Sequence, residues 1–351
     1  MKCIHGYINR STKPFTLDQC RICWRAARDE SIRTRPPDLV PAAVRILPSS
    51  ALLSQLEGPA FNASILRYRG RTLMAYRTGW AGAEIHLCEL DDRDRPGPSI
   101  TLDLRHSLSG YGREDPRLFV FRDRLHVSFI GFDGDWNGKM ATNQLYARLR
   151  ENFTVEKIWA PQIEGRPWDQ WEKNWGFFEY LGELYAVYTI DPHVVLRIDG
   201  DRAEIAAQAP NPYEWIGGRM SGGAPPVLVG NEYWNWFHGT HDLGTNWPTR
   251  QYTIGLYTFD AEPPFGIRRF AAFPLAWADE STRPADQHCP VIFPGGTTFD
   301  GTTWRIACGI HDRWIEIRDY AHADALGALC DSSADDAEGD EMRSVNAMNG
   351  D

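Results

Sequence analysis

Short stretches in which apolar and polar residues alternate recur along most of the chain, separated by Gly, Pro and Asp. Alternation with a period of two places one set of side chains on one face of a β-strand. Helical patterns are scarce outside residues 320–330. The pattern therefore predicts an all-β protein.

A weak repeat runs through these stretches, with a turn-like pair of residues, a large apolar anchor and an alternating strand in that order. It occurs five times, at 70–77, 122–129, 182–188, 230–238 and 300–307. The anchors are Leu73, Leu125, Leu184, Tyr233 and Trp304, spaced by 52, 59, 49 and 71 residues. These spacings are near the size of a four-stranded propeller blade. The repeat predicts a five-bladed β-propeller over residues 45–320, and a β-sandwich with similar hairpins is the alternative.

Each hairpin follows a short polar or Gly/Pro-rich motif. The five motifs are Phe61–Ser64, Glu114–Arg117, Lys173–Trp175, Gly222–Pro226 and His288–Val291. Equivalent positions of the blades converge on the central channel of a propeller, where ligands usually bind. We therefore expect these motifs to meet at one place.

Composition narrows the class of protein. Hydrophobic residues make up 42% and charged residues 24%, which is ordinary for a globular chain. The formal net charge is −10, and residues 331–351 carry seven acidic residues and one Arg, so −6 of it lies in that tail. The tail has almost no large apolar residue, which predicts disorder. A basic face is missing, so a nucleic-acid partner is not expected.

The chain begins without the apolar run of a signal peptide, and no stretch of about 18 apolar residues occurs. Its seven cysteines are scattered and odd in number, which does not indicate a disulfide framework. We expect a soluble, cytoplasmic protein with no membrane partner.

Residues 1–30 predict a small extension with its own chemistry. Cys3, His5, Cys20 and Cys23 are four ligands of the types that zinc prefers, arranged as two close pairs. A closed four-ligand site would hold together a segment too short to fold alone. We expect a structural zinc there, and the alternative is that the four residues are unrelated and reduced. We expect no cofactor for catalysis.

The motifs resemble those of glycoside hydrolase family 130, the β-mannoside phosphorylases and their hydrolytic relatives. The resemblance covers residues 55–315 and rests on Asn62-Ala63-Ser64, Glu114-Asp115-Pro116-Arg117, Gly222-Gly223-Ala224-Pro225-Pro226 and His238. It implies a five-bladed propeller with an axial site and an inverting reaction, in which Asp115 is the acid and phosphate is the attacking anion. The implied partners are a mannoside or oligosaccharide with phosphate or a sugar phosphate.

The resemblance also implies roles for further residues. Candidates for the anion-binding cluster are Arg77, Arg117, Lys173, His193, Arg219 and His238. Candidates for sugar contacts are Asn62, Glu114, Asn174, Trp175 and Asp191. Asn and Asp also close turns in β proteins, and Trp also fills the space between blades, so structural roles are the alternatives. The segment from Glu172 to His193 departs from the phosphorylases towards mannosyl-transferring members.

Asp115 precedes Pro116, and a residue before proline favours the extended conformation. We therefore expect Asp115 in an extended innermost strand. Inversion needs an acid at the leaving oxygen and a nucleophile on the opposite face of the sugar. Phosphate needs no base, whereas water needs a second carboxylate. A site with one acid and several cations therefore favours phosphorolysis.

Two alternatives remain open. An inverting hydrolase would use Glu172, Glu179, Asp191 or Asp312 as its base. A non-catalytic carbohydrate-binding propeller would instead have Asp115 locked in a salt bridge, because fold alone does not decide function.

Overall fold

The computed structural model describes residues 38–47, 49–52, 59–79, 82–133, 141–166, 171–213, 215, 217–242, 250–271 and 273–331. Regular structure in this part of the chain is almost entirely β-strand, so the all-β prediction is confirmed. The described residues include two short α-helices, α2 (Ser49–Leu52) and α3 (His322–Gly327), the second where the sequence predicted one. Two single turns of 3-10 helix lie at Ser107–Ser109 and Glu280–Thr282.

Three of the sheets have four antiparallel strands each. One consists of β2 (Ala60–Tyr68), β3 (Arg71–Thr78), β4 (Glu84–Leu90) and β5 (Ile100–Thr101). The next consists of β6 (Gly112–Phe121), β7 (Arg124–Asp133), β8 (Ala141–Leu149) and β9 (Val155–Trp159). The third consists of β21 (Ile292–Phe299), β22 (Thr303–Ile310), β23 (Trp314–Ala321) and β1 (Ala43–Leu47).

A fourth sheet adds one strand to the same pattern. It consists of β11 (Gly176–Tyr180), β12 (Glu183–Ile190), β13 (His193–Asp199), β14 (Arg202–Ala209) and the parallel edge strand β10 (Gln162–Ile163). The remaining sheet has seven strands. They are β15 (Arg219–Gly222), β16 (Val227–Val229), β17 (Glu232–Asp242), β18 (Arg250–Asp260), β19 (Ile267–Ala271), β20 (Ala276–Trp277) and β24 (Leu329–Asp331).

The seven-stranded sheet departs from a regular blade. Both β15 and β16 pair with β17, because Pro225 and Pro226 lack the N–H that a continuous strand needs. Both β19 and β20 pair with β18, and β24 extends the edge. The expectation of five blades is therefore corrected: the propeller arrangement is present, but four sheets are regular blades and the seven-stranded sheet is not.

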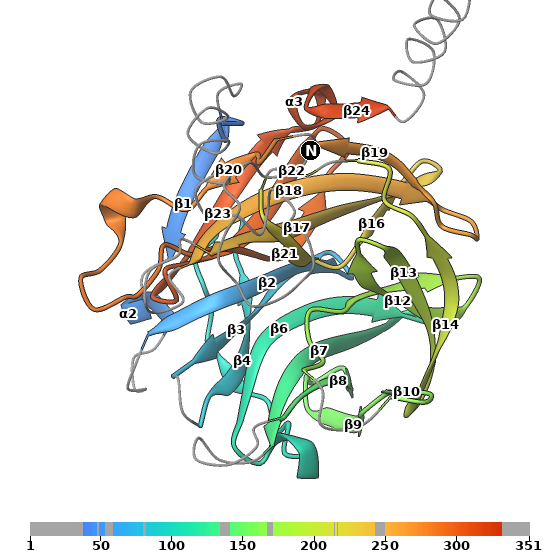
Figure 1. Cartoon of the computed structure of the whole chain (residues 1–351). Coiled ribbons are helices and arrows are strands. Elements are labelled where there is room, and N and C mark those ends of the chain that lie inside the picture. Colours follow the sequence, from blue (N-terminus) through green and yellow to red (C-terminus); the bar gives the residue numbers. More distant parts are fainter. Residues whose placement is uncertain are drawn as a thin grey trace, which may run out of the picture.

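The sheets lie around a common centre (Figure 1). Contacts run from β21 to β2, from β2 to β6, from β6 to β11, from β12 to β15 and from β16 back to β21. The ring is closed by β1, which comes first in the described chain and pairs with β23 along its whole length. This closure joins the two ends of the folded region.

All five predicted hairpins are present, one in each sheet. They are β2–β3, β6–β7, β11–β12, β16–β17 and β21–β22. Their anchors Leu73, Leu125, Leu184, Tyr233 and Trp304 are at most 4% exposed. Burial of the anchor against the next sheet removes apolar area from water and gives the repeat its physical basis.

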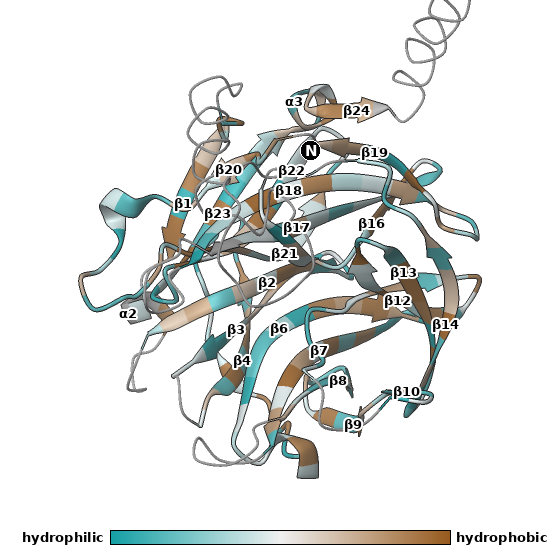
Figure 2. Cartoon of the chain, viewed as in Figure 1, coloured by the Kyte–Doolittle hydropathy of each residue, from teal (hydrophilic) through white to brown (hydrophobic). Residues whose placement is uncertain are grey.

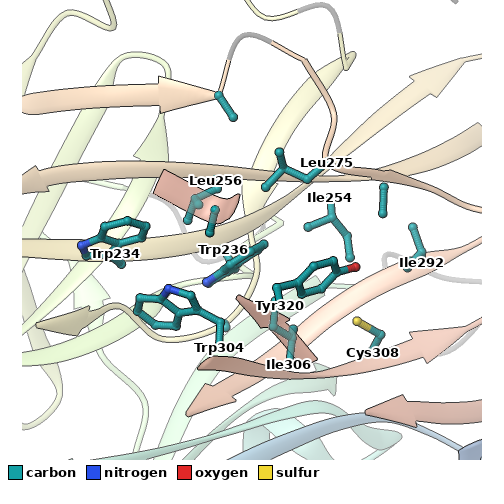
Figure 3. Packing of buried hydrophobic residues seen from close by; sticks show 14 of the residues in the cluster. Trp234, Trp236, Ile254, Leu256, Leu275, Ile292, Trp304, Ile306, Cys308 and Tyr320 are labelled. Carbon is teal, nitrogen blue, oxygen red and sulfur yellow. The ribbon is translucent and has the colours of Figure 1, made fainter. Parts of the chain in front are cut away.

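The hydrophobic core lies between neighbouring sheets, where the apolar residues of the strands gather (Figure 2). Between the seven-stranded sheet and the β21–β22–β23 sheet, Trp234 stacks on Trp304 with ring centroids 5.2 Å apart, and Trp236 stacks on Tyr320 at 5.6 Å (Figure 3). Aromatic side chains thus fill the space between these sheets. The polar motifs lie outside this packing, on the innermost strands.

The innermost strands share a local irregularity. The register of β2 shifts between Phe61 and Ser64, and that of β6 shifts between Glu114 and Arg117. Within these bulges Asn62 has φ 48° and Asp115 has φ 50°. A bulge inserts an extra residue and redirects a side chain, and Asn and Asp are among the residues that tolerate a left-handed conformation. The irregularity therefore positions two polar side chains at the centre.

The strands extend from Ala43 to Asp331, slightly beyond the expected 45–320. The predicted extension at 1–30 and all but the first residue of the predicted 331–351 tail lie outside the described residues. No helix in the described part of the chain is long and apolar enough to span a membrane.

Candidate active site

Asp115 sits in the bulge of β6, near the centre of the ring. The sequence predicted an extended conformation here because of Pro116, and this prediction is wrong, since φ is 50°. The bulge outweighs the preference before proline because Asp tolerates the left-handed region. The Asp115 side chain keeps 15% of its surface accessible, so it reaches solvent from a largely enclosed position.

One guanidinium group joins two consecutive carboxylates. Arg77, from β3, places Nη2 2.7 Å from Oε1 of Glu114 and Nη1 3.4 Å from Oδ1 of Asp115. Asn62, from β2, donates from Nδ2 to the same Oδ1 of Asp115 at 2.8 Å. Two residues of the neighbouring β2–β5 sheet therefore hold Asp115, and one of its oxygens receives both donors.

A third carboxyl, Asp312, joins from the turn between β22 and β23. Gln287 donates from Nε2 to Oδ2 of Asp312 at 3.2 Å, and the nearby Asn62 side chain partly offsets the rise in the pKa of Asp312. Asn62 thus links Asp312 to Asp115. Sequence reasoning named Asp312 only as one of four candidate bases, and the fold selects it by bringing it to this cluster.

The three carboxyls have different proton affinities. Burial raises the pKa of Glu114 to about 7 and that of Asp312 to about 6, and in both the negative charge of Asp115 adds to the effect. Burial also favours neutral Asp115, but Arg77, Arg117 and the hydrogen bond from Asn62 outweigh it and lower the pKa. At neutral pH Asp115 is therefore ionised, and a proton is held most readily by Glu114.

Arg117 has a positioning role. Its side chain is fully buried, donates to the carbonyl oxygen of Gly223 and donates from Nη2 to Oδ1 of Asn174 at 2.8 Å. Burial lowers the pKa of Arg117 to about 10. Arg117 is a predicted anion ligand, but its donors are used by Gly223 and Asn174, so it connects the chain segments around Asp115.

Three accessible cations form a group that Lys173 joins to the cluster. Arg219 begins β15 opposite Thr240 of β17, and Arg250 begins β18 opposite Asp242, so both lie at the same end of the seven-stranded sheet. Lys173 precedes β11. Burial lowers its pKa most, and the charges of Arg250 and Arg219 lower it further, whereas the charge of Asp115 raises it.

These cations are set apart by their lack of acidic partners. Lys173, Arg219 and Arg250 are all exposed, and within the described part of the chain none forms an ion pair with a carboxylate. Sequence reasoning missed Arg250, because only the register of β17 and β18 brings it to the end of the sheet where Arg219 lies.

His238 lies beside this cluster but is neutral. It is 4% exposed, stacks on Tyr252 with ring centroids 5.7 Å apart and contacts Phe293. Burial lowers its pKa to about 3, and the charges of Arg117 and Lys173 contribute. Its Nδ1 is buried and has no hydrogen-bond partner among the described residues. A neutral imidazole here serves as a hydrogen-bonding group rather than a charge.

Three predicted residues show no interaction with the Asp115 cluster. His193 is buried, with Nε2 3.2 Å from the Tyr257 hydroxyl, and burial lowers its pKa to about 4. Asp191 is exposed in the turn between β12 and β13. Trp175 is completely buried and packs edge-on against Tyr188, so its face is closed to a sugar.

Two of the four candidate bases have structural partners. Glu172 accepts hydrogen bonds from Trp175 Nε1 at 3.3 Å and from the Tyr188 hydroxyl at 3.2 Å. Glu179 accepts the backbone N–H of Arg122 at 2.7 Å, which joins two sheets. Asp312 is the candidate that shares a partner with Asp115.

The described residues contain no cluster of three or more His, Cys, Asp or Glu side chains that would hold a metal ion. The predicted zinc ligands Cys3, His5, Cys20 and Cys23 lie outside the described residues. The site above is therefore built from carboxyls, amides and cations.

No profile of a known protein family matches the sequence, and no curated protein does. Solved structures do match. A glycosyl hydrolase from Bacteroides ovatus is 14% identical with TM-score 0.61, over 82% of this chain and 91% of that one. A β-1,2-mannobiose phosphorylase from Listeria innocua is 15% identical with TM-score 0.57, over 82% and 99%.

A mannose phosphorylase from Leishmania mexicana, solved with a phosphate ion, is 13% identical with TM-score 0.57, over 85% of this chain and 93% of that one. These identities are too low to transfer residue roles from one protein to the other. The alignments nevertheless cover 82–85% of this chain and 91–99% of the matched chains. The resemblance inferred from the motifs is matched at the level of the fold. This chain therefore has the β-propeller fold of glycoside hydrolases and mannoside phosphorylases.

Proposed function

We propose that the protein is an inverting, phosphorylase-type enzyme that cleaves β-mannosides with phosphate, or forms them from a mannose 1-phosphate. The observation that carries the proposal is the convergence of ionised Asp115 with three accessible cations that have no acidic partner among the described residues. The similar folds of a mannobiose phosphorylase and of a mannose phosphorylase with phosphate support it.

Lys173, Arg219 and Arg250 would hold the phosphate. Arg offers two parallel donors to a phosphate, and Lys acts as a point charge, so the set suits a tetrahedral dianion. Positive charges fixed beside the reaction centre also stabilise negative charge that moves onto or away from phosphate oxygens. Cations grouped around Lys173 would hold the anion in a fixed position relative to Asp115, as an in-line displacement requires.

Asp115 would handle the proton. In bond formation, ionised Asp115 accepts the proton of the acceptor hydroxyl while that oxygen attacks C1 and phosphate leaves. In cleavage the steps reverse: Asp115 donates to the leaving oxygen as phosphate bonds to C1 on the opposite face. A bound phosphate would offset the part of the positive charge that Lys173 contributes at Asp115, so the protonated form becomes more accessible when phosphate is present.

Hydrolysis is the second candidate, and Asp312 is the observation that favours it. An inverting hydrolase needs a base that activates water, with its carboxyl roughly 6.5 to 9.5 Å from the acid. Asp312 shares Asn62 with Asp115 and has a pKa of about 6, which suits a base near neutral pH. The accessible cations favour phosphorolysis over hydrolysis.

The test is turnover of a β-mannoside panel with and without phosphate, and of mannose 1-phosphate with sugar acceptors. Phosphorolysis requires phosphate-dependent release that falls roughly 10²- to 10⁴-fold in Asp115→Asn, the range for loss of a general acid. Asp103→Asn is the matched control, because Asp103 is exposed and pairs only with Arg105 in the described structure.

The outcomes separate the candidates. Sugar release that is independent of phosphate and lost in Asp312→Asn would replace phosphorolysis by hydrolysis. Binding of mannosides without turnover, unchanged in Asp115→Asn, would indicate a carbohydrate-binding propeller and contradict the proposal.

A further inference from the structure

Trp171 differs from the other described tryptophans. Its side chain is 60% exposed, whereas Trp175, Trp236 and Trp304 are completely buried. It lies just before β11, at the inner end of that sheet, where its backbone bridges to Thr142 of β8. An indole exposed at this position costs hydration free energy, which a ligand would recover.

The segment that carries Trp171 is held in place by the contacts of the next residue, Glu172. The backbone N–H of Glu172 donates to the carbonyl oxygen of Thr142 at 2.9 Å. The Glu172 carboxylate accepts from Trp175 and Tyr188 and pairs with Arg166. With residue 172 anchored, extended chain presents residues 171 and 173 on the opposite face, and both are exposed. The exposure is thus built into the fold.

Trp171 is also linked to the proposed reaction centre. The Nζ atom of Lys173 lies 5.8 Å from the centroid of the Trp171 ring. Lys173 in turn interacts electrostatically with Asp115 and belongs to the group of accessible cations. The exposed indole therefore lies next to Lys173, one side chain away from a residue that interacts with Asp115.

We propose that Trp171 forms a sugar subsite that stacks against the pyranose ring of the acceptor, the leaving sugar in the cleavage direction. The inference rests on the proposed function and makes it more specific: the substrate has at least two sugar units, and the second unit packs on Trp171. A flat aromatic face suits the apolar C–H face of a pyranose, and Lys173 beside it donates to hydroxyl groups.

The experiment compares Trp171→Ala, Trp171→Phe and wild type, with Leu181→Ala as control. Leu181 is 83% exposed in the turn between β11 and β12, so it is an accessible apolar side chain of the same sheet. In the synthetic direction we expect Trp171→Ala to raise the KM for the acceptor roughly tenfold, the loss expected for one buried apolar face. The KM for mannose 1-phosphate and kcat stay within about twofold, because neither depends on that face.

Trp171→Phe restores most of the affinity, and Leu181→Ala behaves as wild type. Binding is measured separately by calorimetry with β-1,2-mannobiose and with mannose 1-phosphate, so the inference is tested without turnover. Wild type that binds mannobiose without turnover, with binding lost in Trp171→Ala, supports the subsite while the proposed reaction fails.

Three results would overturn the inference. One is an acceptor KM and mannobiose affinity unchanged in Trp171→Ala. Another is wild type that binds no mannoside of the panel. The third is a wild-type oligomer that dissociates on Trp171→Ala, because the indole would then be covered by a second copy of the chain.

Discussion

Arg77 organises the candidate site at the scale of single residues. Its buried guanidinium contacts Glu114 and Asp115, and its charge also acts on Asp312. One cation cannot hold three neighbouring carboxyls in their ionised form, because each desolvated charge repels the others. Burial keeps the proton on Glu114 before Asp312, whereas Asp115 remains ionised because Arg117, Lys173 and the hydrogen bond from Asn62 add to the effect of Arg77.

Glu114 should make the stability of the protein depend on pH. Its pKa is about 7 in the folded protein against an ordinary value of 4.5, so the folded state binds more protons between these values and stability falls as pH rises from 4.5 to 7. We expect Glu114→Gln to remove roughly 1 to 3 kcal/mol of this loss. Urea denaturation of both proteins at pH 5 and pH 8 measures it.

Glu164→Gln is the control for this effect, because Glu164 is 78% exposed. Parallel pH profiles for wild type and Glu114→Gln would show that Glu114 does not titrate in this window.

At the scale of elements, bulged inner strands position the polar side chains, and glycines on neighbouring strands leave room for them. A Cβ atom on Gly309 of β22 would lie 1.9 Å from Oδ1 of Asn62 and 2.9 Å from its Cα. The space that Asn62 needs in order to contact both Asp115 and Asp312 is therefore provided by a different sheet.

We expect Gly309→Ala to displace Asn62 and to lower kcat/KM at least tenfold, since small misplacements at a reaction centre are costly. It should also destabilise the protein by roughly 1 to 3 kcal/mol, as overpacking does. Gly110→Ala is the control, because a Cβ there meets no atom within 4 Å. Kinetics and thermal denaturation of both variants measure the effect, and equal activity of the two would contradict it.

At the scale of the whole molecule, the ring depends on the pairing of β1 with β23. Asp94, which is 3% exposed in the loop after β4, pairs with Arg45 of β1 and with Arg305 of β22 at 3.0 Å. Arg45 also reaches Asp319 of β23 at 2.7 Å. This network ties the closing strand to its own sheet, through Arg305 and Asp319, and to the neighbouring β2–β5 sheet, through Asp94.

Removing the charge of Asp94 should loosen the closure. Asp94→Asn keeps the left-handed conformation (φ 58°) but leaves two arginines with only Asp319, and we expect a loss of roughly 1 to 3 kcal/mol. Thermal denaturation measures it, with exposed Asp92→Asn as control. An unchanged Tm would show that β1 is held by its backbone hydrogen bonds alone.

The sequence by itself determined the hairpins and their anchors, because turn residues, alternation and a large apolar residue act within about ten neighbours along the chain. The motifs before the hairpins pointed to Asp115 and Lys173, since unusual polar residues at equivalent positions must meet in a ring of repeated units. Arg77 and Arg219 were implied by the family resemblance. Sequence reasoning placed His193 and Trp175 there too, but local patterns do not distinguish a buried side chain from an accessible one.

Only the tertiary structure decided which distant residues meet. It selected Asp312 and added Arg250, brought by strands whose register the sequence does not reveal. It placed Asp115 in a left-handed bulge, against the preference before proline, because pairing of the whole strand outweighs one residue's propensity. It also left Trp171 exposed and buried Trp175 four residues later, since burial depends on which sheet packs alongside, and that is a property of the closed ring.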